Sequence, residues 1–373
     1  MKLLARDNRV LWMNSISTRT PSLTSGRDLG KIVNKLKSFA KGPMRVEGQM
    51  DVYTPIVLPF PHNPLAVRLN QQILRGSVSL LRRNREMRDF QLWSFIPSAA
   101  KYIGKLGESL VVYYCTDEWS HFSSVDRDKT MELERELCQR ADIVFTTATT
   151  LLETKRLYNP ETHLALHGVD QAHFARALLP TTELAPELRD VKPPVIGFVG
   201  LIQDWVDVEL IRYMAERHHD WTFVLVGKAL VDVSPLERLS NVRLLGRKPY
   251  EALPSYLKAF DVGIIPFVLN ELTRNVNPIK LREYLSAGLP VVSTDIPEVA
   301  RYVRDQGNLA NACTVATTHD DFLAGVERAL DTDSREARLA RSEAMLAETW
   351  ERKVHVLGEH IHRVRAKRGS GYT

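Results

Sequence analysis

The stretch NPIKLREYLSAGLPVVSTDIPE, residues 277–298, predicts a helix, a tight turn and a buried strand in quick succession. Asn277 is expected as the N-cap, and Pro278 stands where proline is favoured at the start of a helix. Gly288 fits the left-handed cap that ends a helix, and the run after Pro290 is typical of a buried strand. A helix that turns at once into a strand is a unit of an open α/β sheet.

Lys280 is unusual within this helix. It falls at the third helical position, where exposed backbone N–H groups carry roughly half a positive charge. A cation there costs about 0.3–1 kcal/mol, and a capping box would place Glu or Gln at the same position. An anion shared by the N–H groups and the ammonium would explain the lysine. The alternative is that the side chain extends into solvent.

Composition limits the class of protein. The chain has 373 residues, which suggests two domains, and its 44% hydrophobic and 25% charged residues indicate a soluble globular protein. Its apolar runs are too short to cross a bilayer, and its N-terminus lacks the apolar core of a signal peptide. Three scattered cysteines form neither a disulfide framework nor a zinc motif, so a cytoplasmic location is expected.

The net charge of +5 is unevenly distributed, because basic residues gather in 27–45 and 68–105. Segment 68–93 interleaves basic and apolar residues, as a peripheral membrane face does. This pattern favours the inner face of an anionic cell membrane as a partner. Nucleic acid is not expected, because no known binding motif accompanies the charge. A solvated helix face is the alternative interpretation.

Helix and strand patterns alternate along both halves, which indicates parallel, doubly wound sheets. In the first half, strand patterns cover 9–16, 51–63, 109–119, 142–148 and 163–170, and helix patterns cover 28–40 and 128–141. In the second half, strands are expected at VIGFVG, WTFVLVG, NVRLLG, DVGIIPF and PVVST, with helices between them.

The polar, proline-rich segment 181–194 is the expected linker. It divides an N-terminal domain, 1–180, from a C-terminal domain, 195–345. A final helical segment, 346–373, is expected to pack back on the N-terminal domain. Two such α/β domains would enclose a ligand cleft at the carboxyl ends of their strands.

The second half resembles a known family. VIGFVGLIQDWVDVELI, WTFVLVGKA, NVRLLGRKPYEALPSYLKAFDVGIIPF and NPIKLREYLSAGLPVVST stand in the order found in glycosyltransferases of the GT-B fold. The likeness is strongest to the retaining bacterial cell-surface polysaccharide group, of teichuronic-acid and capsule type. HGVD followed by Phe174 also fits that group.

This resemblance implies two Rossmann-like domains facing a cleft. It also implies a hexosyltransferase that moves a sugar from a nucleotide-diphosphate sugar to a glycan or lipid-linked acceptor in cell-surface polysaccharide synthesis. No cofactor and no metal are expected. DRD (126–128) resembles a metal-binding Asp-x-Asp motif, but its position directly before a helix favours a role as a helix cap.

The family pattern also implies donor-binding residues. A helix start holds the diphosphate, and a glutamate in the same helix, Glu283 by position, accepts from the ribose hydroxyls. Lys280 would then contact the diphosphate. The sequence departs from the pattern where Asn275 replaces a second glutamate and where the usual Arg and Lys after the first C-domain strand are absent. The remaining expected donor residues are Arg274, Asn277, Gly200, Arg247 and Tyr250, with Lys248 as an alternative to Arg247.

YYCTDEWSHF (113–122) ends a predicted strand of the first half, so its polar residues are expected to face the cleft. Asp117 and His121 are the candidate catalytic residues. An inverting enzyme needs one of them as a base. A retaining enzyme uses them to position the acceptor, because the leaving phosphate takes the proton. Glu118 and His167 are expected on the acceptor side, and capping or turn chemistry is the alternative interpretation for this loop.

Two other functions stay open at this stage. A sugar-nucleotide epimerase of the same fold would act without an acceptor. A non-catalytic glycan- or membrane-binding module would bind no nucleotide. The second follows from the abrupt start of the chain, because relatives carry an earlier βα unit. Two explanations stay open: the protein is shorter than its relatives, or the start given for the sequence is late.

Overall fold

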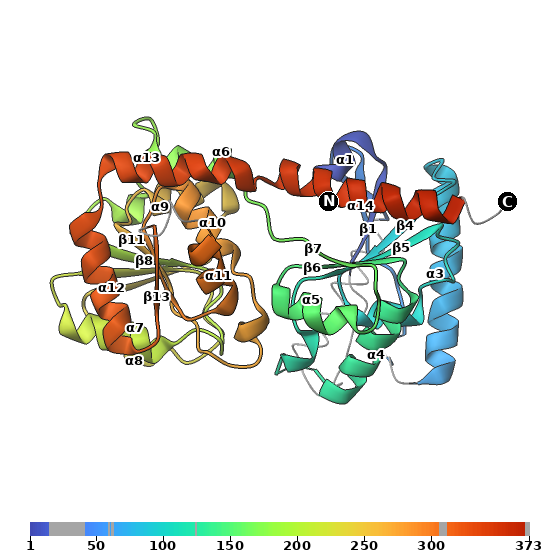
Figure 1. Ribbon diagram of the computed structural model, residues 1–373, viewed down its shortest axis with the longest axis horizontal. Helices are drawn as coiled ribbons and strands as arrows, with labels where there is room; N and C mark the ends of the chain where they lie inside the picture. Colours follow the sequence, from blue (N-terminus) through green and yellow to red (C-terminus); the bar gives the residue numbers. More distant parts are fainter. Residues whose placement is uncertain (15–41, 59, 61–62, 124, 306–311, 370–373) are drawn as a thin grey trace. The chain divides into compact units, whose positions relative to one another are not determined.

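The computed structural model describes residues 1–14, 42–58, 60, 63–123, 125–305 and 312–369 (Figure 1). The chain divides into two compact units. Unit 1 comprises Met1–Thr147, Leu151–Ala165 and Val354–Thr373, and unit 2 comprises Ala148–Thr150 and Leu166–Lys353. The predicted helix 28–40 and most of the basic segment 27–45 lie outside the described residues.

Unit 2 is built on a six-stranded sheet in which every pair of neighbouring strands is parallel. Its central strands are nearly continuous apolar runs, as a sheet covered on both faces requires. The strands are β8 (Val195–Val199), β9 (Thr222–Val226), β10 (Val242–Gly246), β11 (Val262–Ile265), β12 (Val291–Thr294) and β13 (Cys313–Ala316).

Helices flank this sheet on both faces (Figure 1). They are α6 (Gln171–Ala175), α7 (Val208–Arg217), α8 (Ser234–Glu237), α9 (Leu253–Leu257), α10 (Ile279–Ser286), α11 (Pro297–Asp305), α12 (His319–Thr332) and α13 (Arg335–Ala344). Short 3₁₀ turns include η5 (Tyr250–Ala252), η6 (Thr273–Asn275) and η8 (Met345–Glu348).

The order of the strands across unit 2 is β10-β9-β8-β11-β12-β13. The chain therefore starts in the middle of the sheet, winds outward to β10, and returns to the other side of β8 with β11. This is the order of dinucleotide-binding sheets, whose ligands lie beyond the carboxyl ends of the strands where the winding reverses. In unit 2 that switch point is the pair β8 and β11.

Unit 1 contains two smaller sheets. Strands β4 (Gln91–Ser94), β5 (Leu110–Cys115), β6 (Ile143–Thr146) and β7 (Thr162–Leu164) form a parallel sheet in chain order. Strands β1 (Val10–Met13) and β3 (Met50–Tyr53) pair in parallel, and β2 (Met44–Glu47) adds to β3 in the antiparallel sense. The expected α/β class with parallel sheets is confirmed, although β2 and β4 were not predicted.

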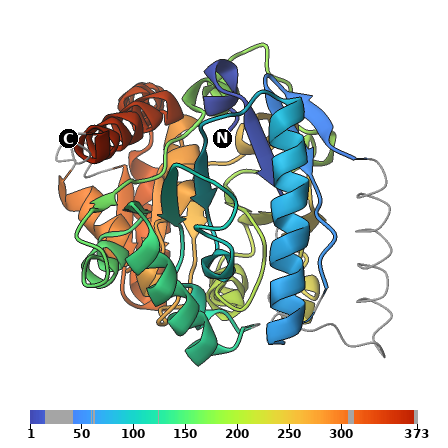
Figure 2. The ribbon, with the colours of Figure 1, turned by 90° about the vertical axis from the view of Figure 1, so that its right-hand side faces the viewer.

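The helices of unit 1 include α1 (Leu4–Asp7), α3 (Pro64–Asn84), α4 (Arg127–Arg140) and α5 (Thr149–Arg156), with the 3₁₀ turns η1 (Pro97–Lys101) and η2 (Trp119–His121). Figure 2 shows α3 running the height of this unit. Leu74 and Val78 of α3 pack with Tyr102 and Leu106, so one stripe of the helix is buried and the opposite stripe is exposed.

The unit boundaries differ from the expected domain boundaries. Ala185 and Leu188, in the expected linker 181–194, are buried in the core of unit 2. The last helix, α14 (Trp350–Gly369), belongs to unit 1 from Val354 onward. Its apolar residues pack against the β4–β7 sheet: Leu357, Ile361 and Val364. Among the helices that the structure describes, none has the length and apolar character needed to span a bilayer.

Candidate functional site

Helix α10 begins one residue later than predicted. Its N-cap is Pro278, whose side chain offers no hydrogen-bond acceptor, and Lys280 is therefore the second helical residue. Asn277 is not the cap, because its Oδ1 accepts from the buried guanidinium of Arg282 at 3.0 Å. The start of α10 consequently has no side-chain cap. Backbone N–H groups in a first turn that lacks a cap remain available to an anion.

Lys280 lies across the end of β8. A Cβ built on Gly200 would stand 2.4 Å from the Lys280 Cε and 2.8 Å from its Nζ, so the lysine packs against bare backbone. The ammonium lies 5.6 Å from the ring centres of both Phe198, near the end of β8, and Phe267, which follows β11. Cation–π attraction of this kind partly replaces water around the charge. Lys280 therefore sits at the switch point of the sheet.

Glu283 shares this environment one turn along α10. Burial raises its pKa, and the nearby Lys280 ammonium partly opposes that rise. Burial likewise lowers the pKa of Lys280, and Glu283 partly opposes the fall. Within the described residues, neither side chain has a hydrogen bond or an ion pair. Two opposite charges are thus partly buried without direct pairing, which is unfavourable until a ligand supplies partners.

Tyr284 fixes α10 to the sheet. Its hydroxyl accepts from the Val199 N–H at 2.7 Å, at the end of β8. A Cβ on Gly263 in β11 would stand 2.6 Å from the Tyr284 ring, so the glycine is needed for the ring to reach the strand. Because Tyr284 is fully buried, the neighbouring Glu283 and the first turn of α10 are held in register with β8 and β11.

Tyr250 joins this site from η5. Its ring stacks on His173 with centres 4.3 Å apart and an angle of 10°, and burial, with Asp170 and Glu283 as further causes, raises its pKa. Glu283 therefore lies close enough to Tyr250 to act on its pKa. Asp170 and His173 were not predicted for the site. The sequence signal that could have indicated these two residues is HGVD, whose Asp170 caps α6.

The other residues that were expected to bind the donor are either exposed or bonded to residues outside this site. Arg247 and Arg274 are exposed, and Asn275 uses its amide to donate to the Glu271 carbonyl at 2.7 Å. Lys248 is engaged elsewhere, because its Nζ lies 2.5 Å from Glu187. The structure therefore brings together Lys280, Glu283, Gly200 and Tyr250, and within the part of the chain that it describes Arg247 and Arg274 form no hydrogen bond or ion pair with them.

In unit 1, the predicted loop does follow the carboxyl end of β5. Burial raises the pKa of Asp117, and the Thr116 hydroxyl, which donates to its Oδ2 at 2.8 Å, partly opposes the rise. His121 ends η2 and is partly exposed. Glu118 has a different environment from the one expected, because Lys155 and Ser120 donate to its two oxygens. Asp126 caps α4, as DRD predicted.

His167 lies in unit 2, in edge-to-face contact with Trp350. Burial, with Arg282 as the second cause, lowers its pKa to about 4. Its Nδ1 is buried and has no hydrogen-bond partner among the described residues. This neutral imidazole lies beside Gly168, where a Cβ would stand 2.6 Å from the Trp350 backbone. Glycine is thus required for close packing here.

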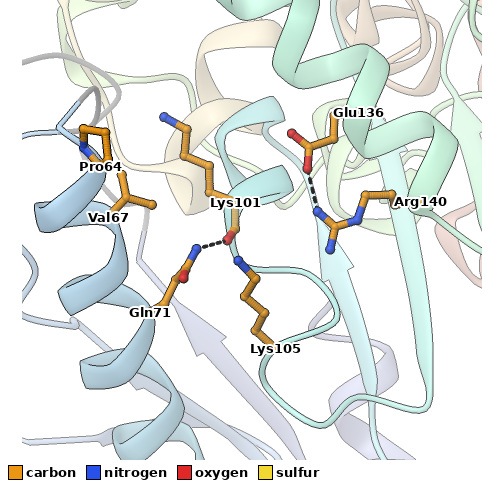
Figure 3. Close-up of a pocket in the computed structure, with 7 residues that line it drawn as sticks. All are labelled: Pro64, Val67, Gln71, Lys101, Lys105, Glu136 and Arg140. Carbon is orange, nitrogen blue, oxygen red and sulfur yellow. Dashed lines mark hydrogen bonds and ion pairs between the residues drawn. The ribbon is translucent and has the colours of Figure 1, made fainter.

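Unit 1 also has a surface pocket of about 330 Å³ (Figure 3). Its charged lining residues are Lys101, Lys105, Glu136 and Arg140. Arg140 already pairs with Glu136 at 2.6 Å and donates to the Ala100 carbonyl at 3.0 Å. Arg140 is therefore already engaged within the unit, and the pocket is a weaker candidate than the α10 site.

Solved structures with a similar fold include sucrose-phosphate synthase from Thermosynechococcus elongatus. Its TM-score is 0.65, and the two proteins are 13% identical over 96% of this chain and 99% of that one. HepE of Anabaena, solved with UDP and glucose, gives a TM-score of 0.63 and 15% identity over 96% and 99% of the two chains. The fold is GT-B. The likeness to these GT-B proteins shows their architecture only, because the identities are low.

Sequence comparison agrees with the GT-B assignment. Residues 193–332 match the family model described as Glycosyl transferases group 1. A Bacillus subtilis (strain 168) protein, assigned by name to teichuronic acid biosynthesis as the glycosyltransferase TuaH, is 29% identical over 269 residues. That match covers 66% of this chain and 64% of the relative. The predicted resemblance to cell-surface polysaccharide glycosyltransferases is confirmed.

Proposed function

We propose that this protein is a glycosyltransferase of cell-surface polysaccharide synthesis. It moves a sugar from a nucleotide-diphosphate sugar to a glycan or lipid-linked acceptor. The single observation that carries the proposal is the Lys280 ammonium, which lies beside the uncapped start of α10 at the β8–β11 switch point. An ammonium and uncapped N–H groups at one point form a site for a diphosphate.

Each site residue then has a role that follows from its chemistry. The Lys280 ammonium and the first-turn N–H groups of α10 hold the diphosphate and stabilise the negative charge that grows on it as the sugar leaves. The Glu283 carboxylate accepts from the ribose hydroxyls, which restores the partners that burial removes. Gly200 leaves space for the lysine and for close approach of the donor. Tyr250, a residue that is 45% exposed, offers its ring beside the ribose position.

The proposed transfer is a retaining one. The bond between the sugar C1 and the leaving phosphate oxygen breaks, and a bond forms between C1 and the acceptor oxygen. The acceptor proton passes to the leaving phosphate, so no strong protein base is required. Asp117 and His121 position the acceptor hydroxyl and interact with the positive charge on the sugar ring. Measuring the anomeric configuration of the product by NMR tests this assignment, and an inverted product would contradict it.

The hexosyltransferase type, independence from metal and a location at the inner face of the cell membrane belong to the same proposal. Lys280 and the helix end supply the positive charge that a divalent cation supplies in other transferases. We therefore expect EDTA to leave the rate unchanged. A loss of activity with EDTA that Mg²⁺ or Mn²⁺ restores would contradict metal independence.

The nucleotide panel tests the function itself. UDP, GDP, ADP, TDP and their sugars are added to the wild type, to Glu283→Ala and to Glu336→Ala, and thermal unfolding is followed. Glu336 is an exposed glutamate of α13 and serves as the matched control. One nucleotide class should stabilise the wild type and Glu336→Ala but not Glu283→Ala. No stabilisation of the wild type by any nucleotide would overturn the proposed donor site. Formation of a sugar isomer without acceptor would indicate an epimerase.

A further inference from the structure

Lys155 is a charged side chain in the interior of unit 1, where only 5% of it is exposed. Its Nζ donates to Glu118 Oε2 at 2.7 Å and to Glu134 Oε2 at 2.8 Å. Lys155 lies on α5, Glu134 lies on α4, and Glu118 lies in the loop after β5. One ammonium therefore joins two helices to the loop that carries the candidate residues Asp117 and His121.

Each oxygen of the two carboxylates already accepts a hydrogen bond within unit 1. The second oxygen of Glu134 accepts from the Tyr113 hydroxyl and from the Cys115 thiol at 3.4 Å. The second oxygen of Glu118 accepts from the Ser120 hydroxyl at 2.9 Å. Buried carboxylates are stable only when they are paired and hydrogen-bonded in this way. Removing Lys155 would leave two buried carboxylates facing each other without a cation.

Other contacts hold the start of the loop. The position of its later residues therefore depends on how Glu118 is held. The Thr147 hydroxyl donates to the Thr116 carbonyl at 2.8 Å, and the Cys115 thiol contacts the Asp117 carbonyl at 3.4 Å. These contacts fix the first two residues of the loop. Beyond them, Glu118 stands directly before η2, which ends at His121. The pairing of Glu118 with Lys155 therefore determines where η2 starts.

We propose that Lys155 is a positioning residue for the acceptor side of the transfer reaction. Through Glu118 and Glu134 it holds residues 116–122 in the geometry in which Asp117 and His121 receive the acceptor. The inference rests on the proposed function. Lys155 itself touches no substrate, so its removal acts through the loop, and a small misplacement of a positioning group lowers the rate of the chemical step more than it weakens donor binding.

Three variants test this inference. Lys155→Met removes the ammonium and keeps the length of the side chain. Glu118→Gln weakens only the Lys155–Glu118 ion pair, which joins Lys155 to the loop, and keeps the Lys155–Glu134 pair. It therefore tests the positioning role if Lys155→Met does not fold. Lys129→Met is the matched control, because it breaks an exposed ion pair of 2.7 Å with Asp126 on α4. Each is compared with the wild type by hydrogen–deuterium exchange and by hydrolysis of UDP-glucose, in which water replaces the acceptor.

We expect amide exchange over residues 116–122 to increase in Lys155→Met and Glu118→Gln. We expect kcat to fall by about 10-fold or more while KM for UDP-glucose stays within about 2-fold of the wild type. The Lys129→Met variant should match the wild type in both measurements. A fourth variant, Lys155→Arg, should recover part of the kcat that Lys155→Met loses, because it restores a cation. These results would not follow from a lysine that only stabilises unit 1.

Unchanged exchange over 116–122, or an equal effect on kcat in Lys129→Met, would overturn the inference. So would a rise in KM with unchanged kcat. These outcomes differ from failure of the proposed function, in which the wild type neither binds nor hydrolyses any nucleotide sugar. In that case the exchange data alone still show whether Lys155 holds the loop.

Discussion

Lys280 occupies the space that a side chain on Gly200 would take, with its Cε only 2.4 Å from the position of a Gly200 Cβ. The contact joins the first turn of α10 to the end of β8. It explains why a lysine is found at an unfavourable helix position: the ammonium is directed over the switch point of the sheet. The lysine and the glycine therefore form one feature of the proposed donor site.

Gly200→Ala should weaken nucleotide binding. The new methyl group must displace the end of the Lys280 side chain, which is flexible and moves at little cost. The backbone φ of +156° adds strain of roughly 1–3 kcal/mol for a residue with a Cβ. Calorimetric titration with nucleoside diphosphates should show at least about 10-fold weaker binding.

Gly358→Ala is the control for this substitution. A Cβ at Gly358 on α14 meets open space, so alanine should stabilise the helix by about 0.5–1 kcal/mol. It should leave nucleotide binding unchanged. Equal affinities for all three proteins would show that the Lys280–Gly200 contact has no part in binding.

Glu283→Gln should make the unliganded protein more stable. Burial raises the pKa of Glu283, so the folded state holds a proton more tightly than the unfolded state above pH 4.5. The free energy of unfolding consequently decreases as pH rises through that window. Glutamine mimics the neutral acid, and we expect a gain on the order of 1 kcal/mol at pH 7, or about 2–4 °C in Tm.

The same substitution should abolish stabilisation by nucleotide, because an amide cannot accept from both ribose hydroxyls. Thermal unfolding at pH 5 and pH 7, with and without the best nucleotide of the panel, measures both effects. A Glu283→Gln protein that is less stable at pH 7 and still responds fully to nucleotide would contradict the assigned role.

His167→Gln should remove part of the acid sensitivity of unit 2. The pKa of His167 is about 4 in the folded state, against 6.5 for the ordinary side chain. Between these values the unfolded chain binds a proton that the folded chain does not, so stability falls as pH decreases from 6.5 to 4. The slope from this group is at most about 1.4 kcal/mol per pH unit. Urea unfolding at pH 7, 6 and 5 measures it.

The control for this prediction is His219→Gln, because His219 is exposed in the same unit. Its pH profile should parallel that of the wild type, whereas the profile of His167→Gln should be flatter. Identical slopes for the wild type and His167→Gln would show that the pKa of His167 is the same in the folded and unfolded states.

Helix α3 is the expected membrane face of the protein. No Asp or Glu occurs between Pro64 and Asn84, and the exposed side carries leucine and arginine: Leu65 (74% exposed), Leu69 (50%), Leu80 (61%), Arg68, Arg75 and Arg83. Reversing two charges, Arg68→Glu with Arg75→Glu, should reduce sedimentation with phosphatidylserine vesicles. About 1 kcal/mol per basic residue corresponds to a loss of at least 10-fold.

Charge reversal of two exposed arginines of unit 2, Arg328→Glu with Arg335→Glu, controls for net charge. This variant should sediment like the wild type. Equal binding of all three proteins, or equal binding to neutral phosphatidylcholine vesicles, would contradict a specific anionic membrane face on α3.

The sheet of unit 2 was predictable because its strands are buried apolar runs and its helices have clear ends. Gly288 does end α10 with a φ of +83°, and Asp207 caps α7. The start of α10 was placed one residue early, because Asn277 is normally a strong cap. Its side chain instead accepts from Arg282, which also pairs with Glu348 at 3.1 Å, a contact that depends on tertiary structure.

The features that the sequence did not predict depend on contacts between residues far apart in the chain. Strand β4 reads QLWS, which mixes polar and apolar residues because it lies at the edge of its sheet. Glu118 was expected at the acceptor because it follows a strand, whereas it pairs with Lys155, 37 residues away. A lysine four residues after the buried Leu151 of α5 was the available signal for a buried cation.

The most direct test of the account is the affinity difference between UDP and uridine, measured by calorimetric titration in the wild type and in Lys280→Met. If UDP is not the nucleotide selected by the panel, the selected diphosphate and its nucleoside replace the pair. We expect the diphosphate to bind the wild type at least about 100-fold more tightly than the nucleoside, because charge-assisted contacts hold the phosphates. Lys280→Met should remove most of that difference and leave the nucleoside affinity unchanged. An undiminished difference in Lys280→Met would contradict the diphosphate site at the start of α10.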